Sequence, residues 1–268
     1  MNPFITGHTR VFGILADPIG HVRTPQGINA LCQAQGIDAV MVPLHVGAQD
    51  LPAVVQGLRA LRNFDGLVVT VPHKSAMKNL CDALTPAAER IGAVNVVHRS
   101  ADGRLLGDML DGEGFVAGLR REGIEPRGQK VYLAGAGGAA SAIAFALASA
   151  GVRQLTLANR SAEKVAQLIA RLKASHPDLM VTMGSRDPSG HGLVVNGTSL
   201  GLKPGDALPL DTSALHANQV VVDIIMEPAT TALMAQAQAR GCRTLGGLPM
   251  LQCQLELMAR FMRLGRTD

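Results

Sequence analysis

The stretch VYLAGAGGAASAIAFALASAGV, from Val131 to Val152, constrains the fold of this chain more than any other segment. It carries no charged residue and is long enough to span a bilayer. Gly135, Gly137 and Gly138 interrupt it, however, and alanine dominates its second half. A buried strand, a glycine turn and a closely packed helix explain this pattern better than a membrane span does. We therefore expect no membrane-spanning segment here.

The glycine turn has the form of a dinucleotide-binding loop. It follows an apolar strand and opens a helix, which is the context that the pattern G-x-G-x-x-A requires. Glycine permits the tight turn and lets backbone N–H groups approach a pyrophosphate at the helix N-terminus. The alternative is an ordinary glycine-rich turn. The residues expected to contact a dinucleotide are Gly135, Ala136, Gly137, Gly138 and Ala139.

The end of the next apolar strand, LTLANRS, bears on the choice between NAD and NADP. Asn159 stands where an acidic residue would hold a ribose 2′-hydroxyl, and Arg160, Ser161 and Lys164 follow it. An acidic side chain would repel a 2′-phosphate, whereas Asn, Arg and Ser side chains would accept one. NADP is therefore favoured, and NAD is not excluded. A solvated helix start is the alternative explanation for the two basic residues.

Apolar runs alternate with amphipathic segments twice along the chain. The first alternation begins at VFGILA and ends in a hairpin turned at Asp102-Gly103, and the second begins at Val131. Such alternation predicts an α/β fold with mostly parallel sheets, and two alternations predict two lobes. Ligands in these folds bind beyond the carboxyl ends of the strands. In the stretch GLVVTVPHK, an apolar run ends just before Thr70 and Lys74, which places these two residues at such a position.

Composition excludes several classes of protein. Hydrophobic residues make up 47% of the 268 residues and charged residues 17%, which is typical of a globular chain. The net charge of +4 comes from dispersed basic residues, and one tyrosine and six phenylalanines offer few stacking partners, so nucleic-acid binding is not expected.

Cysteine and histidine usage points to a reducing compartment and to no metal site. The four cysteines show no C-x-x-C or ligand spacing, and His21 and His73 have no second ligand at a suitable distance in sequence. The N-terminus has no apolar signal region, so we expect a cytoplasmic protein. The cysteines are Cys32, Cys81, Cys242 and Cys253.

Taken together, the motifs resemble those of the shikimate/quinate dehydrogenase family from about Phe12 to Gln254. They are ADPIGHVRTPQGIN, GLVVTVPHK, ERIGAVNVV, GDMLDGEGF, AGAGGAA, ANRS, VVNGTSLG and GGLPMLQCQ, in the family's order and spacing. The resemblance implies an N-terminal α/β substrate-binding domain over residues 1–106, joined by a C-terminal helix over 248–268. A Rossmann dinucleotide-binding domain with a parallel sheet is expected over residues 107–247.

The resemblance also implies a catalytic pair, Lys74 and Asp111. Oxidation of an alcohol requires a hydride acceptor and a group that takes the hydroxyl proton, and a lysine beside a carboxylate can do this. Because the two groups would titrate together, proton transfer is assigned to the pair. Taken singly, Lys74 would be interpreted as a solvated lysine and Asp111 as a helix cap.

The substrate positions depart from the family pattern. Polar residues of the family are replaced by Val22, Val68, Met109 and Met226, whereas Thr24, Thr70, Asn95 and Gln254 keep polar side chains. Each lost hydrogen bond is worth roughly 0.5–1.5 kcal/mol, or about 1.5–3 kcal/mol to a charged group. A pocket that has lost these hydrogen-bonding side chains should bind a polyhydroxylated acid more weakly. Arg23 could compensate by pairing with a carboxylate.

Further cofactor positions also follow from the resemblance: Asn196, Thr198, Ile224, Gly247 and Met250. The family's G-L-G-M is Gly247-Leu-Pro-Met250 here, so Pro249 removes one backbone donor.

The resemblance implies a dehydrogenase of aromatic amino acid biosynthesis, which moves a hydride reversibly between a nicotinamide cofactor and a ring hydroxyl or ketone of shikimate or a related alicyclic acid. Quinate, an amino-substituted analogue or a less polar alicyclic alcohol are alternative substrates. A non-catalytic nucleotide-binding regulatory protein is the alternative outside enzymes. The expected partners are a small-molecule substrate and a dinucleotide, in a monomer or homodimer.

Overall fold

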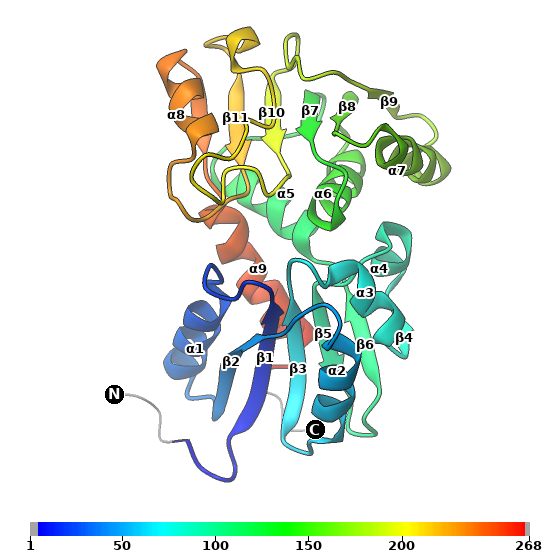
Figure 1. Ribbon diagram of the computed structural model, residues 1–268, viewed down its shortest axis with the longest axis vertical. Coiled ribbons are helices and arrows are strands. Elements are labelled where there is room, and N and C mark those ends of the chain that lie inside the picture. Colours follow the sequence, from blue (N-terminus) through cyan, green and yellow to red (C-terminus); the bar gives the residue numbers. More distant parts are fainter. Residues whose placement is uncertain (1–4, 266–268) are drawn as a thin grey trace. The chain divides into compact units, whose positions relative to one another are not determined.

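The computed structural model describes residues 5–265 and divides into two compact units, each built on one six-stranded sheet (Figure 1). Unit 1 contains the chain up to Leu110 together with the segment from Gln254 onward, and unit 2 is Asp111–Cys253. Unit 1 was expected to end at residue 106 and to resume at residue 248. The first boundary lies four residues later than expected, after Leu110, and the second lies six residues later, at Gln254. The α/β class predicted from the alternation of apolar segments is confirmed.

The sheet of unit 1 is mixed. Its strands, in spatial order, are β2 (Ala39–His45), β1 (Arg10–Ala16), β3 (Phe64–Val69), β5 (Val96–Arg99), β6 (Leu105–Asp108) and β4 (Ala83–Leu84). β1 is parallel to β2 and β3, whereas β5 is antiparallel to both β3 and β6. β5 and β6 form the hairpin expected around Asp102-Gly103.

Because β5 runs against its neighbours, its first residues lie where β3 and β6 end. Val68 pairs with Val96, and Val96 with Asp108, at what we call the carboxyl edge of this sheet. At the opposite end, which we call the amino edge, Arg99 pairs with Leu105 close to the start of β3. The polar residues that follow β3 therefore gather at the carboxyl edge.

Five helices and a short 3-10 turn surround this sheet. They are α1 (Thr24–Gln35), α2 (Leu51–Ala60), α3 (Lys74–Met77), the turn η1 (Lys78–Leu80), α4 (Pro86–Ile91) and α9 (Leu248–Phe261), the last of which carries residues of both units. Phe12 and Ile14 of β1 form the core with Met258 and Met262 of the C-terminal segment. Met258 and Met262 are thus core residues of unit 1.

Unit 2 contains an all-parallel sheet. Its strands, in spatial order, are β12 (Arg243–Leu245), β11 (Val220–Asp223), β10 (Leu193–Asn196), β7 (Lys130–Ala134), β8 (Gln154–Ala158) and β9 (Met180–Met183). Its helices are α5 (Asp111–Arg121), α6 (Gly138–Ser149), α7 (Ala162–Ser175) and α8 (Ala232–Ala239), with a 3-10 turn η2 (Thr212–Ala214). The strand order reverses beside β7, which is the point where doubly wound sheets bind dinucleotides.

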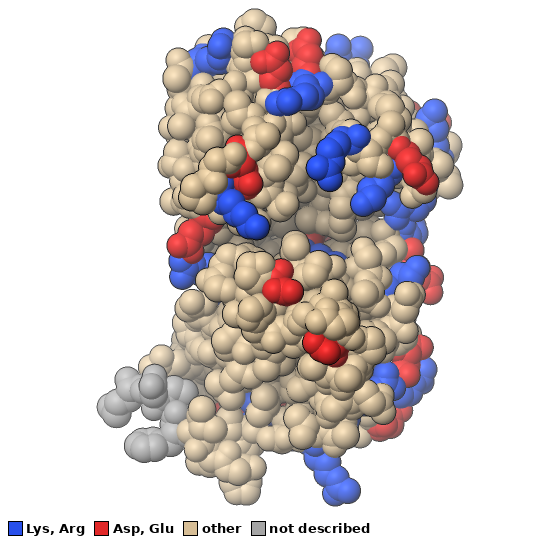
Figure 2. Space-filling model, viewed as in Figure 1, with Lys and Arg blue, Asp and Glu red and all other residues tan. Residues whose placement is uncertain are grey.

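The uncharged stretch from Val131 to Val152 folds into β7, a glycine turn and α6, as its sequence predicts. No helix among residues 5–265 is both long enough and apolar enough to cross a membrane. Charged side chains of both signs are scattered over the face shown in Figure 2.

Candidate functional site

Lys74 is held at the carboxyl edge of the unit 1 sheet by backbone hydrogen bonds. It is the first residue of α3 and follows a turn in which the N–H of His73 donates to the carbonyl of Thr70 (2.9 Å). The N–H of Thr70 donates to the carbonyl of Leu15 (3.0 Å), and the carbonyl of Lys74 accepts from Val94 (2.9 Å). The position of the lysine backbone is therefore fixed by two neighbouring segments, although its side chain is half-buried.

His73 contributes to this arrangement in a way that the sequence did not indicate. Its side chain is buried, and its ring Nε2 lies 2.8 Å from the carbonyl oxygen of Val46, in the loop that follows β2. This bond joins the turn before Lys74 to the neighbouring loop of the same unit. The only signal in the sequence was a histidine between Pro72 and Lys74, just after an apolar run.

Asn95 links three strands at the same edge. Its backbone carbonyl accepts from Val69 (2.8 Å) and its N–H donates to Asp108 (2.9 Å). Its buried side-chain Oδ1 accepts a hydrogen bond from the N–H of Leu110 (2.8 Å). Asn95 therefore fixes the backbone just before Asp111, in addition to the substrate contact that the family resemblance implies.

The apolar replacements in unit 1 have been absorbed into its core. Val22 and Val68 both belong to the hydrophobic cluster that includes Met258 and Met262. Thr24 and Gln254, which keep polar side chains, are also buried. The predicted substrate positions of unit 1 thus comprise polar residues, of which Thr24, Asn95 and Gln254 are buried, and valines that pack in the hydrophobic cluster.

In unit 2, the glycine turn has the conformation that a dinucleotide loop needs. Gly135 has φ +121°, and a Cβ there would come within 3.0 Å of the carbonyl oxygen of Gly197, at the end of β10. A Cβ on Gly137 would meet no atom within 4 Å, and no side chain caps the first turn of α6. The first N–H groups of α6 are therefore left without a side-chain cap, and a helix start of this kind can accept a pyrophosphate.

The segment after β8 is exposed. Asn159, Arg160 and Lys164 lie at the surface, and the Nδ2 of Asn159 donates to the carbonyl of Ser161 (3.4 Å). The hydroxyl oxygen of Ser161 accepts from the N–H of Lys164 (3.4 Å) and caps α7. No acidic side chain stands between β8 and the start of α7, so a 2′-phosphate would meet donors and positive charge.

Asn196 and Asp223 end two adjacent strands and form a buried polar network. The Nδ2 of Asn196 donates to Asp223 Oδ1 (3.1 Å), and the hydroxyl of Thr231 donates to its Oδ2 (2.8 Å). The N–H and hydroxyl of Thr198 both donate to Asn196 Oδ1 (3.0 and 2.7 Å). Burial raises the pKa of Asp223 although three donors contact the carboxylate. The network fixes the loop after β10, where cofactor contacts are expected.

The remaining cofactor positions lie near the end of β11. A Cβ on Gly247 would collide with the carbonyl oxygen of Ile224 and approach Met226 to 3.0 Å. Gly247 is therefore required by close packing of the backbone. Met226 and Met250 are half-buried in this unit.

Asp111 is the first residue of α5 and is buried in unit 2. The residue after it, Gly112, packs against the backbone of α6, so that a Cβ would collide with the carbonyl group of Ala142 and lie 2.8 Å from the Cβ of Ala146. Sequence analysis placed Gly112 only as part of a motif. The structure shows that glycine is needed because α5 and α6 approach closely.

Within residues 5–265 there is no cluster of three or more His, Cys, Asp or Glu side chains able to hold a metal ion.

Comparison of the sequence with known proteins shows the family to which this chain belongs. Residues 14–97 match the model described as Shikimate dehydrogenase substrate binding domain, and residues 120–183 match Shikimate / quinate 5-dehydrogenase. A protein from Rubrobacter xylanophilus, named Shikimate dehydrogenase (NADP(+)), is 40% identical over 256 residues, which cover 94% of this chain and 90% of the relative. The chain belongs to the shikimate dehydrogenase family.

Two solved structures are similar to this chain over nearly its whole length. Shikimate 5-dehydrogenase from Listeria monocytogenes, in complex with shikimate and NAD, is 32% identical with a TM-score of 0.85 and covers 99% of this chain and 94% of its own. The ligand-free form of 5-ketofructose reductase from a Gluconobacter strain is 33% identical with a TM-score of 0.84 and covers 98% and 95%. Proteins named for two different ketone or alcohol substrates are therefore similar to this shikimate dehydrogenase family member.

Proposed function

We propose that this shikimate dehydrogenase family member catalyses the reversible oxidation of shikimate to 3-dehydroshikimate with NADP as hydride acceptor. The observation that carries the proposal is the position of Lys74, which the backbone of unit 1 holds at the carboxyl edge beside Thr70 and Asn95. Nearly full-length similarity to a protein named Shikimate dehydrogenase (NADP(+)) supports the same reaction.

The proposed roles of the residues follow from the balance of the reaction. A bound nicotinamide dinucleotide supplies the hydride acceptor for the C–H bond of the alcohol carbon. Lys74 takes the hydroxyl proton as the ketone forms, and the Asp111 carboxylate orients the lysine and balances its charge. Thr70, Asn95 and Gln254 are proposed to donate to or accept from the ring hydroxyls. In the reverse direction, Lys74 returns the proton to the ketone oxygen.

The proposed cofactor residues divide into two groups. The first N–H groups of α6, after Gly135, Ala136 and Gly137, would hold the pyrophosphate. Asn159, Arg160 and Ser161 would hold a 2′-phosphate, which favours NADP over NAD. NAD remains a second cofactor, because the similar Listeria protein was solved with NAD.

The first expected result is faster oxidation of shikimate with NADP⁺ than with NAD⁺. Because guanidinium groups bind phosphate through charge-assisted hydrogen bonds, we expect kcat/KM to favour NADP⁺ by about tenfold or more. Initial rates of cofactor reduction, measured with both cofactors in parallel, test this directly. Absence of turnover with either cofactor would contradict the shikimate proposal itself.

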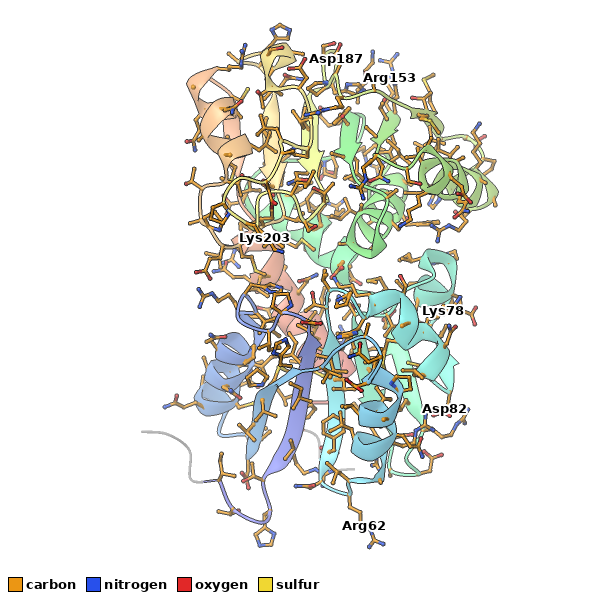
Figure 3. All side chains as sticks on the ribbon, in the orientation of Figure 1. Arg62, Lys78, Asp82, Arg153, Asp187 and Lys203 are labelled. Carbon is orange, nitrogen blue, oxygen red and sulfur yellow. The ribbon has the colours of Figure 1, made fainter. Side chains whose placement is uncertain are left out.

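Replacing Arg160 tests the structural basis of that preference. Arg160→Ala is expected to raise KM for NADP⁺ and to leave KM for NAD⁺ nearly unchanged, so that the ratio of kcat/KM values falls severalfold. Arg153→Ala is the matched control, since Arg153 is an exposed arginine elsewhere in unit 2 (Figure 3). An equal loss with both cofactors would assign Arg160 to adenine stacking instead of phosphate binding.

A second candidate function is the reduction of a polyol ketone that lacks a carboxylate. Val22 replaces a serine that, by the family resemblance, would contact the shikimate carboxylate, and its side chain packs in the hydrophobic cluster of unit 1 while 9% of its surface stays exposed. The similarity to 5-ketofructose reductase is consistent with this scaffold carrying such a reaction. Both candidates use the same Lys74 and differ in what the pocket recognises.

Restoring a hydroxyl at this position distinguishes the two candidates. Val22→Ser is expected to raise kcat/KM for shikimate by about tenfold if shikimate is the substrate, because a hydrogen bond to a carboxylate is worth about 1.5–3 kcal/mol. Val22→Ala removes the same packing without adding a donor and is the control. If neither variant improves shikimate turnover while the wild-type chain reduces 5-ketofructose with NADPH, the polyol candidate is favoured.

A further inference from the structure

Unit 1 has a basic hollow at the amino edge of its sheet. A hollow of about 550 Å³ lies between the end of α2, the residues before β3 and the β5–β6 hairpin. This volume is within the range of small-molecule sites. The six residues of β3 separate its two edges by about 20 Å, at roughly 3.3 Å per residue, so the hollow is distinct from the edge that carries Lys74.

The lining of the hollow is strongly basic. Four arginines from two stretches of the chain line it, accompanied by a single acidic residue, Asp102; they are Arg59, Arg62, Arg99 and Arg104. Asp82 pairs with Arg59 at 2.9 Å. Four guanidinium groups thus face two carboxylates, and an excess of two positive charges remains.

Two of these arginines are held in place by the protein itself. Arg59 donates to Asp82 (2.9 Å) and to the carbonyl of Leu80 (3.1 Å). Arg99 donates through Nε to the carbonyl of Arg59 (3.0 Å), and a Cβ on Gly103 would lie 3.5 Å from its Nη2. Their side chains are therefore pre-organised, which lowers the entropy lost when a ligand binds.

The other two arginines have donors to spare. Arg62 and Arg104 are exposed, and within residues 5–265 neither guanidinium forms a hydrogen bond to another residue. Figure 3 shows Arg62 extending away from the unit, while Asp82 lies beside β4. Both acidic groups are already engaged: Asp82 accepts from the N–H of Leu105 (2.7 Å), and Asp102 from Ser100 and from the N–H of Arg104. The excess positive charge is consequently available to a ligand.

From this arrangement we infer that the hollow binds a small, multiply charged oxyanion, such as a phosphorylated or polycarboxylate metabolite, at a site separate from catalysis. Planar guanidinium groups match phosphate and carboxylate oxygens in bidentate geometry. Arg59 and Arg99 form the fixed part of the site, and Arg62 and Arg104 supply the free donors. The four arginines lie within two short stretches of the chain, and so compact a cluster favours a small molecule over an extended polyanion.

The test is calorimetric titration with two probes, pyrophosphate and citrate, at low salt. The full chain is first saturated with whichever of NADP⁺ or NAD⁺ it binds, so that the glycine loop of unit 2 does not take up the pyrophosphate. We expect one saturable site for at least one probe. In R62A/R104A the dissociation constant should rise at least tenfold, because two charge-assisted contacts are lost.

R121A/R153A is the matched control, because it removes two exposed arginines from unit 2 and changes the net charge equally. In this control variant, the dissociation constant of each probe should stay within about threefold of the wild-type value. Binding of pyrophosphate alone would identify a phosphate ligand, and binding of citrate alone a polycarboxylate. No saturable binding of either probe, or equal losses in the two double variants, would overturn the inference. Thermal unfolding of each variant confirms that it remains folded.

Discussion

Lys74→Ala is expected to lower kcat for shikimate oxidation by about a thousandfold, within the range of 10²–10⁴ that general acid–base groups contribute. The substitution removes the proposed proton acceptor and leaves intact the backbone bonds that hold the turn before α3, including the one from Val94 to the carbonyl of residue 74. Steady-state rates and cofactor titration measure the effect. The dissociation constant of the dinucleotide should change by less than about twofold.

Lys78→Ala is the control for this result. Lys78 begins the 3-10 turn four residues later and has no role in the proposed chemistry (Figure 3). Its variant should keep nearly full activity. If Lys74→Ala retained more than about a tenth of kcat, proton transfer by Lys74 would have to be abandoned, whereas the family and fold would stand.

Gly112→Ala should destabilise the protein by about 2–3 kcal/mol and reduce activity as well. A Cβ at this position meets the backbone of α6 at the Ala142 carbonyl, which cannot move aside as a flexible side chain can. Overpacking of this kind costs typically 1–3 kcal/mol. Because Asp111 precedes Gly112 at the start of α5, separation of the two helices would also displace the proposed catalytic carboxylate. Urea unfolding and kcat measure the two effects.

The same substitution at Gly57 should have the opposite sign. Gly57 lies inside α2, and a Cβ there would meet no atom within 4 Å. Alanine is favoured over glycine in a helix by up to about 1 kcal/mol, so Gly57→Ala is expected to stabilise the protein slightly. Equal stability of wild type and Gly112→Ala would show that α5 and α6 can separate at little cost.

Features encoded within a short segment could be predicted from the sequence. The glycine turn after β7 required only an apolar run, glycines and an alanine-rich helix, and the hairpin at Asp102-Gly103 required only two strands and a turn. Both are set by local sequence, because turn geometry and helix termini depend on the residues that form them. The position of Lys74 could also be predicted locally, because the apolar run that forms β3 ends shortly before it.

Features that depend on strand pairing could not be predicted. The hydrogen bond between Asn196 and Asp223 exists because β10 and β11 pair with these two residues in register. The edge strand β9 was missed, since three of its four residues are exposed and only its pairing with β8 defines it. The basic hollow was missed as well, because Arg59 and Arg99 are 40 residues apart and are brought together by the sheet.

The discontinuity of unit 1 affects the order in which its core can form. Met258 and Met262 are buried beside Phe12 and Ile14, yet the whole of unit 2 lies between them in the chain. During synthesis, the first 110 residues therefore leave the ribosome with an unfilled apolar face, which stays uncovered until the segment after Gln254 has been made. Nascent chains of this protein would accordingly be good clients for chaperones that shield apolar surface, and a fragment ending before α9 would expose the same face permanently.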